Sequence, residues 1–228
     1  MSNAFYVNPE QLVNDKAQFA QKGIARGKSM IAAIYDQGVL MVGENTSASL
    51  NKISEIYDRI AFAGVGKYNE FDRLREAGVR WADNTGFTYA REDVDARALA
   101  NFYAQHVGDM FSEGMKPLEV EILVAQLGNN LRPTKLYHIA YEGTISDEPH
   151  FAVVGGEADE VKKRFASFEG VVTNLSGTLK NALSALSGPE RTVPIEDLEV
   201  GILEDGGSRR TFERLSDERV REILARSD

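Results

Sequence analysis

The chain contains no cysteine, which excludes disulfides, thiol catalysis and thiolate metal sites and fits a reducing compartment. Histidine is scarce, and His106, His138 and His150 lack the close spacing of a zinc site, so an ordinary structural role is expected for each. No apolar stretch approaches the roughly 20 residues needed to cross a bilayer. The N-terminus also lacks the basic and apolar regions of a signal peptide. These absences predict a soluble, cytoplasmic protein with no cofactor and no membrane partner.

Positive charge is also in short supply. The 228 residues include 26 Lys and Arg against 35 Asp and Glu, a formal net charge of −9. Because no Lys/Arg cluster offers a surface for a phosphate backbone, no nucleic acid partner is expected. Linkers rich in Pro, Gly and Ser are missing as well. The length and the 43% hydrophobic composition therefore predict one domain, residues 1–228, with one substantial core.

The first recognisable element is an amphipathic helix over residues 9–26. Asn8 followed by Pro9 is a good helix start, since the Asn side chain can accept from an unpaired N–H and Pro fits the first turn. A narrow apolar stripe then recurs at helical spacing, formed by Val13, Ala17, Ala20 and Ile24. We expect this helix to lie outside the main fold, which would occupy residues 27–228.

Apolar runs and turn residues predict the remaining strands, and stretches with a period near 3.6 predict the helices. The expected strands are residues 30–35, 39–43, 53–56, 60–65, 120–127, 135–140, 151–154, 198–203 and 210–215. The expected helices are residues 67–81, 99–110, 161–168 and 175–186, with a short one opening at Ser216 and Asp93 as a helix cap. Mostly antiparallel strands with helices in separate pairs predict an α+β fold. Two packed sheets, each covered by a helical pair, would bury every apolar stripe.

Short motifs give little support to ligand binding. "GVGK" at residues 64–67 lacks the four-residue gap and the following Ser or Thr of a P-loop, so it is better interpreted as a strand-to-helix turn. Gly155 and Gly156 after "FAVV" have the same interpretation. The acidic run "REDVD" is typical of a helix start, where carboxylates favour the positive end of the dipole.

The segment from Gly27 to Lys67 contains two apolar hairpin strands, a polar link with Lys52 and a third apolar strand. This order resembles the proteasome core family. The strings "KGIAR", "LNKISEIYDRIAFAGVGKYNEFDRLR" and "DEPHFAVVGG" are similar to actinobacterial proteasome alpha subunits. In the catalytic subunits of that family a threonine heads both the chain and the first strand. Here Lys28 stands at that position, preceded by 27 residues.

The resemblance implies a non-catalytic alpha subunit of the proteasome core particle. It implies a four-layer αββα sandwich of the N-terminal-nucleophile hydrolase fold, in a homo-heptameric alpha ring that caps catalytic beta subunits. Lys52 would receive the C-terminal tails of a hexameric regulatory ATPase, and the helix from Lys67 would help to face the beta ring. Unfolded proteins, delivered in the pupylation pathway, would pass a gate in the N-terminal tail, residues 1–8, with gate residues Ala4, Phe5, Tyr6, Val7, Asn8 and Pro9.

Three alternatives stay open at this point. Lys52 could be an ordinary solvated surface lysine. The chain could be cut between Lys28 and Ser29, so that Ser29 serves as an N-terminal nucleophile. It could also form a self-assembling scaffold that holds no protease.

Overall fold

The computed structural model describes residues 8–47, 49–129, 132–168 and 174–226. In chain order its elements are α1 (Pro9–Ile24), β1 (Met30–Tyr35), β2 (Gly38–Glu44), β3 (Ile53–Tyr57), β4 (Ile60–Gly66), α2 (Tyr68–Thr88), the 3-10 helix η1 (Arg91–Asp93), α3 (Ala96–Ser112), β5 (Val120–Gln126), β6 (Lys135–Ile139), β7 (Ile145–Asp147), β8 (Phe151–Val154), α4 (Ala158–Ala166), α5 (Leu175–Ser187), the 3-10 helix η2 (Ile195–Asp197), β9 (Leu198–Glu204), β10 (Phe212–Arg214) and α6 (Asp217–Ala225).

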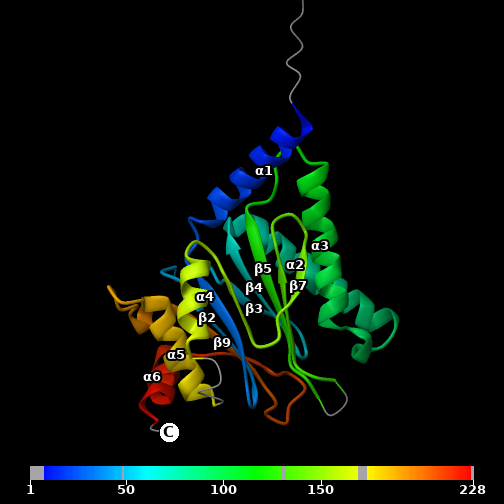
Figure 1. The fold of residues 1–228 in the computed structure, drawn as a ribbon. Coiled ribbons are helices and arrows are strands. Elements are labelled where there is room, and N and C mark those ends of the chain that lie inside the picture. Colours follow the sequence, from blue (N-terminus) through cyan, green and yellow to red (C-terminus); the bar gives the residue numbers. More distant parts are fainter. Residues whose placement is uncertain (1–7, 48, 130–131, 169–173, 227–228) are drawn as a thin grey trace, which may run out of the picture.

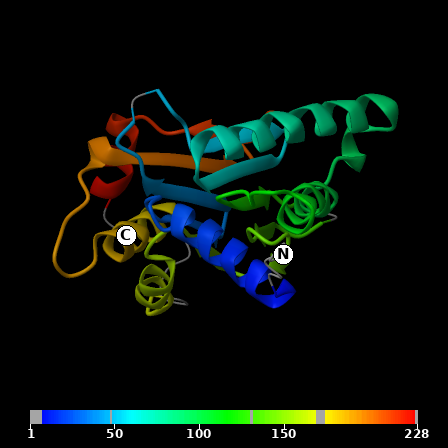
Figure 2. The same cartoon turned by 90° about the horizontal axis from the view of Figure 1, so that it is seen from above.

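The strands form two five-stranded antiparallel sheets, in the orders β10-β9-β2-β1-β8 and β3-β4-β5-β6-β7. Helices α2 and α3 cover the outer face of the second sheet, and α4, α5 and α6 cover the outer face of the first (Figure 1). The view from above shows α1 running across one end of these layers (Figure 2). This arrangement confirms the expected α+β sandwich, except that α6 makes the group of helices on the first sheet larger than a pair.

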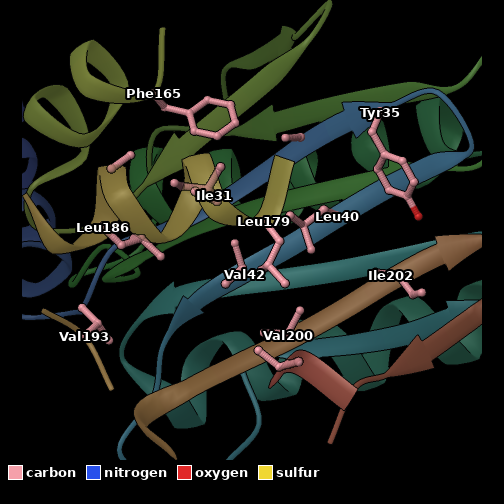
Figure 3. Packing of buried hydrophobic residues seen from close by; sticks show 14 of the residues in the cluster. Ile31, Tyr35, Leu40, Val42, Phe165, Leu179, Leu186, Val193, Val200 and Ile202 are labelled. Atoms are coloured by element: carbon pink, nitrogen blue, oxygen red, sulfur yellow. The ribbon is translucent and has the colours of Figure 1, made fainter. Parts of the chain in front are cut away.

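The inner strands β1, β2, β4, β5 and β9 are buried on both faces, which explains why they are almost continuously apolar. Along β1, Ile31 and Ala33 face the helical layer, while Met30 and Ala32 face the second sheet. Figure 3 shows the outer layer, in which residues of α5, such as Leu179, pack on β1 and β2. Small side chains line the layer between the sheets, including Ala32, Ala61, Ala63 and Ala125. Their size lets the two sheets approach closely.

Helix α1 begins as the sequence predicts. The side chain of Asn8 accepts a hydrogen bond from the Glu10 N–H at 3.1 Å, and Pro9 occupies the first turn. Only the C-terminal half of its stripe is buried, at Ala20 and Ile24. Elsewhere on the helix, large apolar side chains are half exposed, among them Leu12, Val13 and Phe19.

The sequence-based boundaries are wrong at α2. We expected the helix to end near Trp81, but it continues to Thr88. In this extension the helix backbone lies directly against the Tyr57 side chain of β3. The approach is so close that a Cβ added at Gly86 would lie 2.1 Å from the Tyr57 hydroxyl oxygen. The next side chain, Phe87, is 92% exposed. The missing apolar stripe in this last turn explains why periodicity did not detect it.

Two smaller corrections concern helix ends. The cap of α3 is Asp95, whose carboxylate accepts from the Ala98 N–H at 2.9 Å, whereas Asp93 lies in η1. Phe168 lies beyond the end of α4. The last hairpin and its glycine-rich turn are confirmed, and Gly207 has the positive φ (+78°) that such a turn needs. Within the described ranges no helix has both the length and the apolar composition that crossing a bilayer requires.

Candidate functional site

Lys52 lies immediately before β3, at the edge of the second sheet, and is half-buried. Its ammonium donates a hydrogen bond to the backbone carbonyl of Glu44 at 2.8 Å, and its backbone N–H donates to the Glu199 carboxylate at 2.8 Å. Burial lowers the pKa of Lys52, and neighbouring Lys28 lowers it further, while the carboxylates of Glu199 and Glu44 oppose that change. This environment differs from that of a freely solvated surface lysine.

Glu44 ends β2 and brings two further cations to the same place. Lys28 lies 3.0 Å from one carboxylate oxygen and Arg191 2.7 Å from the other, and the Glu44 side chain is only 9% exposed. Burial opposes ionisation of this carboxyl, but the bonds from Lys28 and Arg191 outweigh it and hold the pKa of Glu44 below its ordinary value. The carboxylate is therefore firmly ionised near neutral pH.

Glu199 is the second acid of this group. Its carboxylate accepts from the backbone N–H groups of Lys52 and Ile53 and from the Asn45 side chain, and it forms an ion pair with Arg214. We call these residues the Lys52 cluster: Lys28, Glu44, Lys52, Arg191, Glu199 and Arg214. The sequence analysis identified Lys28 and Lys52 but missed the other four. A usable signal existed, because Glu44 and Glu199 are charged residues within strands that are otherwise buried.

The head of the first strand holds no nucleophile. Lys28 directs its ammonium to Glu44, and the peptide chain runs through it from α1 into β1. Ser29 is buried, and its hydroxyl accepts from the Glu157 N–H at 3.2 Å, at the turn between β8 and α4. The hydroxyl is thus held by a backbone group, while the Lys52 ammonium is held at Glu44. The geometry favours a closed, non-catalytic site over the Ser29 hydrolase alternative.

Four of the six expected gate residues, Ala4, Phe5, Tyr6 and Val7, lie outside the described residues. Asn8 and Pro9 are described, and both serve to start α1.

The motifs interpreted as structural have structural roles here. Lys67 of "GVGK" forms an ion pair with Glu70 at 3.2 Å, at the start of α2. The Gly156 N–H donates to the Gly27 carbonyl, which fastens the β8–α4 turn to the residue before Lys28. Among the residues that the structure describes, no group of three or more His, Cys, Asp or Glu side chains could hold a metal ion.

A second polar group lies beneath α1, and we call Glu121, His138 and Glu142 the His138 cluster. Glu121 and His138 line a cavity of about 690 Å³ beside α1 and the start of α4. His138 Nε2 is 3.9 Å from Glu121, and neither this nitrogen nor Glu142 Oε2 has a hydrogen-bond partner among the described residues. Burial raises the pKa of Glu121 and lowers that of His138, because each carries its charge poorly here.

Comparison with known proteins shows which family the chain resembles. The family model described as proteasome subunit matches residues 24–169. A proteasome subunit alpha from Acidimicrobium ferrooxidans is 56% identical, with 98% of this chain and 97% of that protein covered. Proteins of the same name from Sanguibacter keddieii and an Arthrobacter species are 48% and 45% identical, and the alignments cover 99% and 100% of this chain and 90% and 100% of those proteins.

Proposed function

Because the chain belongs to the proteasome subunit family, among its alpha subunits, we propose that it gates and docks: it controls the passage of unfolded proteins into the core particle and receives a regulatory ATPase. The observation that carries the proposal is the head of the first strand, where the Lys28 ammonium is paired with the Glu44 carboxylate. An ammonium held in an ion pair is no acyl-transfer nucleophile. The alpha-ring role and the non-catalytic role agree with this geometry.

Peptide hydrolysis, in this proposal, belongs to threonine-type beta subunits that stack on the alpha ring. The described surface offers apolar side chains for subunit contacts, which fits assembly with further copies and with a beta partner. On α1, Leu12, Val13 and Phe19 are half exposed, and at the end of α2, Phe87 and Tyr89 are mostly exposed. Such side chains gain burial when copies join into a homo-heptameric ring in the cytoplasm.

Docking is assigned to Lys52. An ammonium has three N–H donors, and one of them is engaged by the Glu44 carbonyl. A terminal carboxylate arriving at a half-buried ammonium forms a charge-assisted hydrogen bond, which is stronger than a neutral one. One such contact is weak. Several tails of a hexameric ATPase, which supplies pupylated substrates, act together through their high effective concentration.

The gate is assigned to the N-terminal tail, residues 1–8, together with Pro9, where α1 begins. Phe5, Tyr6 and Val7 are consecutive large apolar residues in the sequence. Copies of this segment, gathered at the axis of a ring, would crowd a pore and restrict passage. Deletion of residues 2–8 should raise small-peptide turnover by the assembled particle. Unchanged turnover by a fully assembled particle that lacks these residues would refute the gate.

The docking role is tested by Lys52→Ala in particles co-assembled with the beta subunit. We expect ring assembly and basal peptide turnover to stay unchanged and ATPase-stimulated degradation to fall to near the basal level. The matched control is Lys163→Ala, which removes an exposed lysine that pairs with Glu160 on its own helix. Full stimulation in the Lys52 variant would remove this residue from the role.

Native mass measurement after co-expression with a candidate beta subunit separates the proposal from the scaffold alternative. The proposal expects a mixed particle of stacked alpha and beta rings. A stable homo-assembly that ignores the beta subunit would favour the scaffold. Intact mass of the alpha chain in the same sample addresses the Ser29 alternative, because a species beginning at Ser29 would mean that the chain is processed.

A further inference from the structure

The edge of β3 is closed by an ion pair instead of by a neighbouring strand. β3 is the terminal strand of its sheet, and the Lys52 carbonyl accepts from Gly64 N–H on the β4 side. The backbone groups of Ile53 therefore face the open side. The Ile53 N–H donates to Glu199 at 3.0 Å, and its carbonyl accepts from the Arg214 guanidinium at 2.7 Å. One carboxylate and one guanidinium thus satisfy the groups that a further strand would have paired.

Among the described residues, the groups that contact the Glu199 carboxylate are all hydrogen-bond donors. One oxygen accepts from the Lys52 N–H and from the Asn45 side-chain amide, both at 2.8 Å. The other accepts from the Ile53 N–H and from Arg214. The side chain is 6% exposed, so water takes little part in this arrangement. A buried carboxylate with this many donors is held rigidly, because moving it would leave several N–H groups unpaired.

These contacts determine where the Lys52 side chain begins. The backbone N–H groups of Lys52 and Ile53 both donate to the Glu199 carboxylate. The Ile53 carbonyl accepts from the Arg214 guanidinium. The Lys52 backbone is therefore anchored to β9 and β10 of the opposite sheet. From that anchored position the side chain reaches the Glu44 carbonyl at 2.8 Å. Glu44 is in turn held by Lys28 and Arg191.

We propose that Glu199 and Arg214 are positioning residues for docking: they hold the Lys52 backbone so that its ammonium stands where an incoming terminal carboxylate binds. The inference rests on the proposed docking function of Lys52. It adds that docking depends on a pair of residues from the other sheet, which need not touch the partner.

The test uses Glu199→Gln in the assembled alpha–beta particle. Glutamine has nearly the same shape, but its NH₂ group must face donors in either orientation, so the clamp on β3 is weakened. The matched control is Asp58→Asn, at the other end of the β3–β4 hairpin. That change breaks a two-point pair with Arg91, with distances of 3.0 and 2.8 Å, far along the strand from Lys52. Binding is measured with a short synthetic peptide copied from the C-terminus of the cognate ring ATPase, with a free carboxylate or as the amide.

We expect Glu199→Gln to weaken binding of the free-carboxylate peptide about tenfold, whereas the Asp58→Asn particle binds it normally. The amide peptide should bind equally weakly to all particles. A double variant, Lys52→Ala with Glu199→Gln, should bind no more weakly than Lys52→Ala alone, because Glu199 acts through Lys52. Additive losses in the double variant would overturn the positioning role.

A second variant keeps the inference testable if Glu199→Gln does not assemble. Arg214→Lys retains the positive charge but loses the planar fork that bonds Glu199 and the Ile53 carbonyl together. It should give an intermediate loss of free-carboxylate binding, and normal binding would count against the proposal. The outcomes are distinguishable from failure of the docking function itself. Normal peptide binding by Lys52→Ala would refute both the docking role of Lys52 and the positioning role of Glu199 and Arg214. Loss of binding in Lys52→Ala, with normal binding in the Glu199 and Arg214 variants, would refute only the positioning role.

Discussion

The Lys52 cluster and the His138 cluster are both half-buried groups of ionisable residues, yet their hydrogen bonding differs sharply. In the first, Glu44 is held by two cations and Glu199 by four donors. In the second, His138 Nε2 and Glu142 Oε2 are buried without hydrogen-bond partners among the described residues. A buried charge is stabilised only when its lone pairs or protons are matched. The contacts of the Lys52 cluster hold the Glu44 carboxyl in its charged form, whereas burial in the His138 cluster favours the neutral forms of Glu121 and His138.

The largest expected difference in stability between the two clusters follows from removing one acid from each of them. Glu199→Ala removes the ion-pair partner of Arg214 and the acceptor of several N–H groups, and should lower the free energy of unfolding by about 3 kcal/mol. Glu121→Ala removes a carboxyl with one weak hydrogen bond, at 3.4 Å, and should change it by less than about 1 kcal/mol. Urea unfolding of the two variants checks this. Equal losses would show that hydrogen-bond satisfaction does not separate the clusters.

Glu44→Gln should lower the free energy of unfolding by about 2 kcal/mol at neutral pH, because a neutral amide cannot pair with both Lys28 and Arg191. The pH dependence has a definite sign. Folding lowers the pKa of Glu44 below its ordinary value of 4.5, so the stabilisation is complete above that value and is lost as pH falls through the folded-state pKa. The difference between wild type and variant should therefore shrink in acid. Thermal unfolding across acidic pH measures it, and a constant difference would contradict the assignment.

The pH dependence of peptide binding tests whether the charge of Lys52 is needed for docking. Its pKa is lowered from the ordinary 10.5, so its ammonium loses its proton at a lower pH than an exposed lysine does. Binding of the carboxylate peptide should weaken toward alkaline pH, by about tenfold once the lysine is neutral. Lys52→Arg stays charged and should remove this dependence. Fluorescence titrations of both particles check the expectation, and the same alkaline loss in the arginine variant would point to another group.

The smallest effect is expected at His138. Burial and nearby Lys162 lower its pKa, so the unfolded chain takes up a proton more readily than the folded one as pH falls below the ordinary 6.5. Wild-type stability should therefore decline through that window, by less than about 1 kcal/mol in view of the site's partial exposure. His138→Gln should flatten the decline. A decline of the same size in the variant would assign it to other groups.

The apolar pattern predicted most of the fold because most strands and helices carry their own local signal, whereas the short polar strand β7 was not predicted. The Asn8 and Ser216 caps, the strand positions and the antiparallel hairpins follow from residues close together in the chain. The last turn of α2 does not, because Gly86, which has no side chain to mark the turn, packs there against Tyr57 of another element. The Asp95 cap was missed for a simpler reason: two aspartates stand two residues apart, and only the backbone geometry chooses between them.

The Lys52 cluster also contains residues that the sequence predicts and residues that only the folded structure brings together. Lys28 at the head of the first strand, and hence the missing nucleophile, can be read from residue order and family resemblance, as can the position of Lys52. The residues that hold Lys52 cannot, because Glu199 and Arg214 lie 147 and 161 residues from the atoms of Lys52 and Ile53 that they contact. Local periodicity carries no information about which charges meet across two packed sheets. Only the folded chain decides that, since a buried ion pair exists where distant strands bring donors and acceptors within hydrogen-bonding distance.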